Sequence, residues 1–255
     1  EVVGTDGRAP LRIKGRRPLK AIDYEPAAAS AQLKSCVLLA GLNADGETSV
    51  LERTPTRDHT ERMLRWLGVD VREIETAAGK RISISGDSRL TARDIRVPSD
   101  LSSAAFFVVA SGFLEGSELT MPGVCVNGSR RAVVDVLRRL GVEIEIVDER
   151  LVCNEPVADL IVRGRSGIGI SPMLTRGAGH NVSGHAGISS RGGSLLSADV
   201  IANLIDEIPI LAIAGTQLDG GLEVRDAAEL RIKESDRIAA IVENLRRMGA
   251  AVEEF

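Results

Sequence analysis

The apolar and polar positions of this chain repeat three times in the same order. Each repeat begins with a polar residue, continues into an almost entirely apolar helix, and reaches a glycine turn and a short strand. A polar loop, an amphipathic helix that ends at glycine, and a further strand complete the repeat. The repeats run from Ser30 through Gly46 to Gly68, from Asp100 through Gly116 to Gly141, and from Asp206 through Gly220 to Gly249. This order predicts an α/β fold built from repeated units.

The two helices of each repeat differ in how far their apolar residues spread around the helix. The first helices, at residues 33–42, 103–113 and 208–218, are apolar almost all round, which is typical of helices buried on most sides. The second helices carry one apolar stripe and end in arginines followed by Gly68, Gly141 or Gly249, which we expect to act as left-handed stops. In the first repeat, Asp58 and Glu61 have the spacing of a capping box. We therefore expect an inside-out α/β barrel, in which buried parallel helices are wrapped by sheets and outer helices.

A glycine- and serine-rich segment at about residues 175–196 interrupts the pattern. Its composition predicts a long flexible loop between the second and third repeats. His180 and His185 lie in this segment, but no cysteine or carboxylate is close to them in the sequence. Because zinc usually takes three or four protein ligands, we expect no metal site there.

Composition narrows the class of protein. The net charge is -4, which argues against nucleic acid or a membrane surface as a partner. No apolar run reaches the roughly 18 residues that a membrane helix needs. The three cysteines form no CxxC pair, so we expect reduced, buried thiols in a cytoplasmic protein.

The polar residues at the starts and loops of the repeats are the candidates for chemistry. Residues 233–237 read Lys-Glu-Ser-Asp-Arg and stand just before an amphipathic helix, whose N-terminus attracts anions. The alternative interpretation is a solvated, capped helix start. Arg57 holds the equivalent place in the first repeat. These cations predict a pocket for a small anion if the loops converge.

Three further candidates begin the apolar helices, and each has a structural alternative. Asp206 precedes a wholly apolar helix, where it serves either as an N-cap or as a general base in a half-buried site. Ser30 and Gln32 open the first apolar helix, either as caps or as uncharged hydrogen-bond donors to a ligand.

Five motifs in the same order resemble the enolpyruvyl transferase family, and within it the synthases of 5-enolpyruvylshikimate 3-phosphate. They are the segments that read ASAQLKS at 29–35, RDHTE at 57–61, SSAAFF at 102–107, IDEIP at 205–209 and LRIKESDR at 230–237. The resemblance covers nearly the whole chain except the glycine-rich segment.

The resemblance implies a fold and an activity. The family has two similar domains of three βαβαββ units each, with the active site between them. Residues 1–97 would be the later part of one domain, and residues 98–255 two units of the other, so we expect an internal fragment that lacks both ends. The implied reaction transfers the enolpyruvyl group of phosphoenolpyruvate to the 5-hydroxyl of shikimate 3-phosphate, without metal or organic cofactor. The resemblance also implies a cytoplasmic enzyme, which we expect to be a monomer with no partner beyond its two substrates.

The resemblance assigns roles to particular residues. Ser30, Ala31, through its backbone, and Gln32 would bind shikimate 3-phosphate, together with Arg57, Asp206 and Lys233. Arg237 would hold the phosphate or carboxylate of phosphoenolpyruvate. Asp206, Lys233 and Glu234 form the implied catalytic set, with Asp206 as the base near the 5-hydroxyl and Glu234 as the proton donor and acceptor at the methylene carbon.

Two alternatives stay open at this point. The sister enzyme that acts on UDP-N-acetylglucosamine has the same fold and reaction type, although the Lys-Glu-Ser-Asp-Arg motif favours the shikimate enzyme. A non-catalytic fragment is the other alternative, because the family's N-terminal Lys-Ser and Arg clamp, its Gly-Asn-Ala-Gly-Thr loop and its C-terminal arginine and lysine are absent from this chain.

Overall fold

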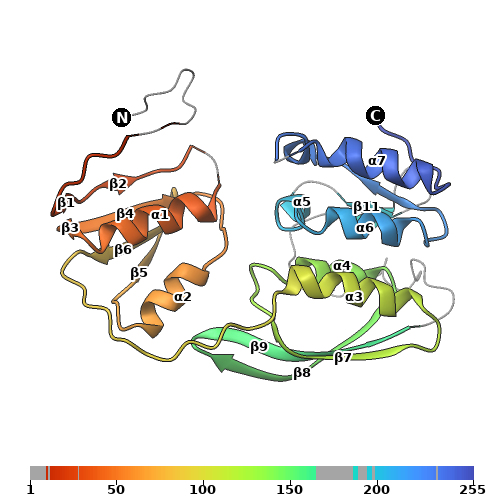
Figure 1. The fold of residues 1–255 in the computed structure, drawn as a ribbon, viewed down its shortest axis with the longest axis horizontal. Helices are drawn as coiled ribbons and strands as arrows, with labels where there is room; N and C mark the ends of the chain where they lie inside the picture. The colour runs from red at the N-terminus through yellow and green to blue at the C-terminus, as the bar shows by residue number, and fades with distance from the viewer. Residues whose placement is uncertain are drawn as a thin grey trace. The chain divides into compact units, whose positions relative to one another are not determined.

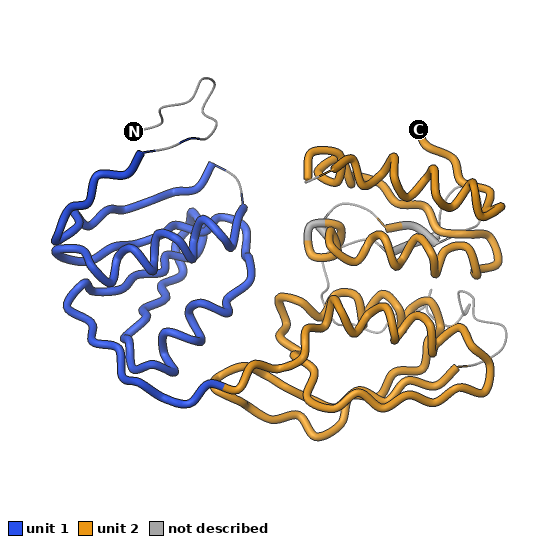
Figure 2. Tube along the Cα trace, viewed as in Figure 1, with its two compact units in different colours: residues 1–95 blue, residues 96–255 orange. Residues whose placement is uncertain are grey.

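The fold was analysed in a computed structural model, which describes residues 10, 12–27, 29–164, 186–188, 194–196, 199–233 and 235–255. The chain divides into two compact units, Glu1–Ile95 and Arg96–Phe255 (Figure 2). Each unit has its own apolar core. Among the described helices, none is both long and apolar enough to cross a membrane.

The first unit is a small sheet with two helices (Figure 1). Its elements are β1 (Leu19–Lys20), β2 (Asp23–Tyr24), α1 (Ala31–Gly41), β3 (Ala44–Asp45), β4 (Glu47–Glu52), α2 (His59–Trp66), β5 (Arg72–Thr76) and β6 (Gly79–Ser85). The main sheet has the order β2-β4-β6-β5, with β2 parallel to β4 and the other neighbours antiparallel. A short parallel pair joins β1 and β3.

The core of the first unit lies between this sheet and its helices. Leu38 of α1 and Leu64 of α2 pack with Val50 of β4 and with Ile82 and Ile84 of β6. The expectation that the first apolar helix is buried on most sides is wrong for α1 in this chain. Only Lys34, Leu38 and Gly41 of α1 are buried, because this unit supplies packing partners to one face of the helix alone.

The second unit contains two small sheets and a stack of helices. Its elements are α3 (Leu101–Phe113), β7 (Glu118–Cys125), α4 (Ala132–Arg139), β8 (Glu143–Val152), β9 (Glu155–Arg163), β10 (Ala186–Ile188), β11 (Ser194–Leu196), α5 (Asp199–Ala202), α6 (Ile208–Gly215), β12 (Leu222–Val224), the 3₁₀ turn η3 (Ala228–Arg231) and α7 (Arg237–Arg247). One sheet is antiparallel in the order β7-β9-β8. In the other, β11 pairs antiparallel with β10 and parallel with β12.

The core of the second unit is aliphatic. Its helices α3 and α6 are the more buried ones, and Val108 and Leu211 represent their buried faces. Phe106 and Phe107 of α3 are nonetheless more than half exposed, at 51% and 63%. The prediction of all-round burial therefore fails on that face of α3 as well.

The glycine-rich segment is not a loop throughout. Residues 186–188 and 194–196 form β10 and β11, so the loop prediction is wrong for them. Leu195 of β11 is in register with Glu223 of β12. This pairing supplies backbone hydrogen bonds that cannot be predicted from the local composition. The remaining residues of the segment, His180 and His185 among them, lie outside the described residues.

The glycine stops of the amphipathic helices are confirmed. Gly68, Gly141 and Gly249 have φ of 91°, 99° and 90°, in the left-handed region that glycine enters at little steric cost. The residue after each glycine donates its N–H to the carbonyl of the leucine five positions earlier, as Val69 does to Leu64 at 2.9 Å. This is the bonding of a Schellman-type helix end.

Candidate active site

The start of α1 carries three of the predicted site residues. Ser30 is the N-cap of α1, and its Oγ accepts a hydrogen bond from the N–H of Leu33 at 3.3 Å. The capping interpretation of Ser30 is therefore confirmed. Ala31 and Gln32 form the first turn of the helix, where backbone N–H groups and the positive end of the helix dipole favour an anion.

A pocket of about 370 Å³ brings Arg57 together with Ala31 and Gln32. Its lining is completed by Ser35, Cys36, Leu39, His59 and Thr60. The residues come from one side of α1 and from the start of α2, which the hydrogen bond between Ser35 Oγ and Thr60 Oγ1 at 2.7 Å holds together. A guanidinium and an amide thus share one open pocket, which suits a hydroxylated anion.

Two details around this pocket correct the expectations from sequence. Ser30 does not line it and instead lines a second, smaller pocket of about 160 Å³ together with Lys34 and Glu52. Cys36 is an exposed thiol, so the expectation of buried cysteines is wrong for this residue.

The capping box predicted at the start of α2 does not form. Asp58 occupies the N-cap position but makes no capping hydrogen bond with its side chain, and its Oδ2 accepts from Arg62 Nε at 2.8 Å. Glu61 is turned away from the cap towards Lys34. The ion pair with Lys34, which is distant in the sequence, thus prevails over the local pattern.

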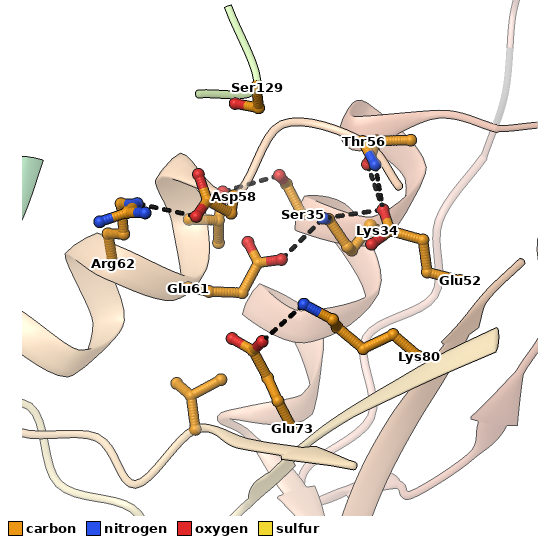
Figure 3. Close-up of polar contacts among 12 residues, drawn as sticks. Lys34, Ser35, Glu52, Thr56, Asp58, Glu61, Arg62, Glu73, Lys80 and Ser129 are labelled. Carbon is orange, nitrogen blue, oxygen red and sulfur yellow. Dashed lines mark hydrogen bonds and ion pairs between the residues drawn. The ribbon is translucent and has the colours of Figure 1, made fainter. Parts of the chain in front are cut away.

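Sequence reasoning missed a buried ion cluster of Lys34, Glu52 and Glu61 next to the site (Figure 3). Lys34 Nζ lies 2.9 Å from Glu52 Oε1 and 2.7 Å from Glu61 Oε1. Burial raises the pKa of Glu61, against the opposing effect of Lys34. A lysine within an otherwise apolar helix was the signal that could have drawn attention to it.

In the second unit, Asp206 and Arg237 are brought together. Arg237 Nη1 lies 3.5 Å from Asp206 Oδ1, which joins the turn before α6 to the first turn of α7. The N-cap of α6 is Glu207, so the capping interpretation of Asp206 is wrong. Lys233 pairs with Glu229 at 2.5 Å, and Glu234 lies outside the described residues. The predicted place of the motif at residues 233–237, at the start of an amphipathic helix, is confirmed for Asp236, the N-cap of α7, and for Arg237, its first residue.

A second polar cluster, unforeseen from the sequence, lies beside Asp206. Glu207 is buried and accepts a hydrogen bond from Ser102 Oγ. Arg130 donates to Ser102 Oγ and to Asp100 Oδ1, the latter at 2.9 Å. These contacts tie the start of α3 to the start of α6 and fix the backbone next to Asp206.

The N-cap of α3 allows a test of these local interactions. Burial raises the pKa of Asp100, but hydrogen bonds from Ser103 and the charge of Arg130 outweigh it and hold the pKa below its ordinary value. A carboxyl with a lowered pKa stabilises the fold above its unfolded-state pKa, and this stabilisation is lost as the pH falls through the folded-state pKa. Asp100→Ala is expected to lower the free energy of unfolding by about 1–2 kcal/mol at pH 7.

Urea denaturation at pH 7 and at pH 3 checks this expectation for Asp100. The loss in Asp100→Ala should shrink at pH 3, and Asp100→Asn, which keeps an acceptor for the Ser103 N–H, should lose less than the alanine variant at pH 7. Equal losses at the two pH values would contradict the ionic contribution.

Comparison with known proteins identifies the family. The family model of EPSP synthase (3-phosphoshikimate 1-carboxyvinyltransferase) matches residues 1–255. A 3-phosphoshikimate 1-carboxyvinyltransferase of Alkalilimnicola ehrlichii is 43% identical over 250 residues, which are 98% of this chain and 50% of that protein. One of Gloeobacter violaceus is 44% identical over 248 residues, which are 97% of this chain and 51% of that protein.

Solved structures agree. An EPSP synthase from Acinetobacter baumannii superposes with a TM-score of 0.76 at 39% sequence identity, over 96% of this chain and 49% of that chain. The repeated α/β units, with polar loops that carry cations and carboxylates, thus define an incomplete enolpyruvyl transferase fold. The chain belongs to the EPSP synthase family. It spans about half the length of the relatives it matches.

Proposed function

We propose that this chain supplies half of an enzyme that transfers the enolpyruvyl group of phosphoenolpyruvate to the 5-hydroxyl of shikimate 3-phosphate. The observation that carries the proposal is the pocket in which Arg57 meets Gln32 and the first turn of α1. The membership of the whole chain in the EPSP synthase family supports the same substrates over UDP-N-acetylglucosamine. The products are 5-enolpyruvylshikimate 3-phosphate and phosphate.

The proposed binding groups match the charges of the two substrates. Arg57 and Lys233 neutralise shikimate 3-phosphate, for which Ser30, the backbone of Ala31 and Gln32 supply hydrogen bonds. Arg237 takes the phosphate or carboxylate of phosphoenolpyruvate. Charge-assisted hydrogen bonds of this kind are stronger than those between neutral groups. Cations placed at helix starts therefore suit ligands that carry both a phosphate and a carboxylate.

The proposed chemistry needs two carboxyl groups for separate proton transfers. Asp206 takes the proton of the 5-hydroxyl as its oxygen adds to C2 of phosphoenolpyruvate, while Glu234 gives a proton to the methylene carbon. The tetrahedral intermediate then loses phosphate as Glu234 removes a proton from the same carbon, and Asp206 passes the hydroxyl proton to the departing phosphate or to solvent. Lys233, next to Glu234, supplies positive charge where negative charge develops. Arg237 Nη1 lies 3.5 Å from Asp206 Oδ1, so the proposed base and the proposed ligand of phosphoenolpyruvate are neighbours.

We further propose the domain assignment and setting that the family implies. Residues 1–97 form the later part of one domain, and residues 98–255 form two repeat units of the other. The active protein is a cytoplasmic monomer that uses neither metal nor organic cofactor.

A chimera tests the proposed function. In it, residues 1–255 replace the matching half of the Alkalilimnicola ehrlichii relative, which is 43% identical to this chain. We expect phosphate release that depends on both shikimate 3-phosphate and phosphoenolpyruvate, and none with UDP-N-acetylglucosamine. Arg57→Ala in the chimera should raise the KM for shikimate 3-phosphate by about 10- to 100-fold, the loss of one charge-assisted contact. A folded chimera that turns over UDP-N-acetylglucosamine, or neither acceptor, would overturn the proposal.

The isolated chain gives a separate prediction. Arg57, Lys233 and Arg237 are part of a larger set of cationic ligands that the family resemblance implies. Losing several contacts of roughly 1.5–3 kcal/mol each costs orders of magnitude in affinity. We therefore expect weak or undetectable binding of phosphoenolpyruvate by the chain alone. Isothermal titration calorimetry that gave a micromolar Kd would contradict this, whereas no turnover by the chain alone would agree with a non-catalytic part.

A further inference from the structure

The ion cluster of Lys34, Glu52 and Glu61 joins three elements at one end of the first unit. Lys34 belongs to α1, Glu52 is the last residue of β4, and Glu61 lies in the first turn of α2. The side chains of the three residues are 2%, 9% and 2% exposed. Because α1 and α2 both begin at the pocket of Gln32 and Arg57, the cluster lies between the two segments that make up the pocket.

Glu52 also fixes the loop that leads to Arg57. Its Oε1 accepts hydrogen bonds from the Thr56 N–H at 2.9 Å and from the Thr56 hydroxyl, in addition to the Lys34 ammonium (Figure 3). Thr56 directly precedes Arg57 in the chain. A single carboxylate oxygen therefore holds the loop between β4 and α2 on the lysine of α1.

The burial of these charges disfavours other positions of the loop and of α2. Removing a carboxylate and an ammonium from water is costly, and the cost is offset only when each charge is paired in good geometry. A displacement of the loop or of α2 against α1 would leave a charge unpaired. The cluster thus favours one relative position of the Arg57 loop and the first turn of α1.

We propose that Lys34, Glu52, Glu61 and Thr56 are positioning residues, which set the affinity of the site for shikimate 3-phosphate by holding Arg57 against the first turn of α1. This inference rests on the proposed function. The four residues do not touch the ligand themselves but influence its binding through the position of Arg57.

A second lysine cluster in the same unit provides a matched control. Lys80 of β6 pairs with Glu73 at 3.1 Å (Figure 3). It also lies 3.7 Å from Glu75, and its side chain is 36% exposed. Like Lys34, Lys80 meets two carboxylates, although Glu73 also pairs with Arg65, and none of these residues lines the pocket. Lys80 is in register with Glu52 in the β4–β6 pairing, so Lys80→Met removes a positive charge beside the cluster but none of the hydrogen bonds that hold the Arg57 loop.

The test uses the 255-residue chain labelled with ¹⁵N and titrated with shikimate 3-phosphate in NMR experiments, which detect even millimolar binding. The variants are Lys34→Met, Thr56→Val, Thr56→Ser, Lys80→Met, Arg57→Ala and the double variant Lys34→Met/Arg57→Ala. Inorganic phosphate serves as the probe for unspecific anion binding. Each variant is measured at a temperature where its spectrum is that of a folded protein.

We expect Lys34→Met to weaken binding about tenfold or more, and Lys80→Met to leave it unchanged. Thr56→Val should weaken binding. Thr56→Ser keeps the hydroxyl that donates a hydrogen bond to Glu52 and should bind as well as the unaltered chain. The double variant should bind no more weakly than Arg57→Ala alone, because residues that act through one group are not additive.

Each outcome separates the inference from the function on which it rests. If the unaltered chain does not bind shikimate 3-phosphate better than inorganic phosphate, the assignment of the Arg57 pocket to this ligand is wrong and the positioning role falls with it, whereas turnover by the chimera tests the proposed function separately. If it binds and the Lys34 and Thr56 variants bind equally well, or if the losses of Lys34→Met and Arg57→Ala add up, the positioning role is wrong. Should Lys34→Met not fold, the Thr56 pair still decides the question.

Discussion

Replacing Asp206 with asparagine is expected to lower kcat at least ~100-fold in the chimera, with a smaller effect on the KM for shikimate 3-phosphate. Asparagine keeps the size of the side chain and an acceptor for Arg237, which lies 3.5 Å away. It removes the carboxylate that we propose as the acceptor of the 5-hydroxyl proton. General base catalysis typically contributes ~100- to 10,000-fold in rate, so the loss should appear in turnover.

Phosphate release under saturating phosphoenolpyruvate measures the effect of Asp206→Asn. Asp135→Asn is the matched control, because Asp135 lies on the first turn of α4 and takes no part in the proposed site. Near-normal turnover of the Asp206 variant would remove this residue from the role of base. A rise in KM alone, with kcat unchanged, would assign it to binding instead.

Replacing Lys34 with methionine is expected to lower the free energy of unfolding of the first unit by about 3–5 kcal/mol at pH 8, the usual cost of leaving a buried charge without its partner. Glu61 would then lack a cation in a site that is almost closed to water. Methionine keeps most of the volume of lysine, so the loss reports charge and not packing. Urea denaturation of the 255-residue chain measures it.

The pH dependence of that loss follows from Glu61. Burial raises the pKa of Glu61, and Lys34 opposes the rise. A carboxyl with a raised pKa binds its proton more tightly in the folded state, so stability falls as the pH rises from the unfolded-state value to the folded one. Without Lys34 the pKa rises further, and the stability lost in Lys34→Met should be smaller at pH 5 than at pH 8.

Two control variants sharpen the stability test. Lys80→Met removes a half-exposed lysine from two carboxylates and should cost no more than ~1 kcal/mol. Lys34→Met combined with Glu61→Leu should recover a large part of the loss, because a buried ion pair replaced as a whole by apolar side chains is often tolerated. A loss of stability in Lys34→Met that is independent of pH and unrelieved by Glu61→Leu would contradict the ionic explanation.

Much of the local structure was predictable because its interactions join residues close together in the chain. Ser30 caps α1 by bonding to Leu33, and Gly249 ends α7 with a left-handed backbone. Such hydrogen bonds span at most five or six residues, so the pattern of residue types contains both partners. The repeated order of apolar and amphipathic helices followed from the same short-range periodicity.

The family and the candidate residues also came from the sequence by itself, since the motifs contain the residues that chemistry requires. The motifs predicted Arg57 and Gln32 as site residues, and also Asp206 and Arg237. What the motifs could not supply was which candidates meet. The structure brings Arg57 to Gln32 in one pocket and Arg237 to Asp206 in another unit of the chain.

Only the tertiary structure decided the contacts between residues that are distant in the sequence. Glu61 had the spacing of a capping box, yet it pairs with Lys34, because the pairing of two buried charges outweighs what a cap contributes. Leu195 belongs to a strand because β12 lies beside it. Local conformational preferences contribute about 1 kcal/mol each. They are overridden where they would leave a buried charge or a backbone polar group without a partner. The sequence by itself therefore determined the elements and the candidate chemistry, and the packing of distant segments determined which of those residues act together.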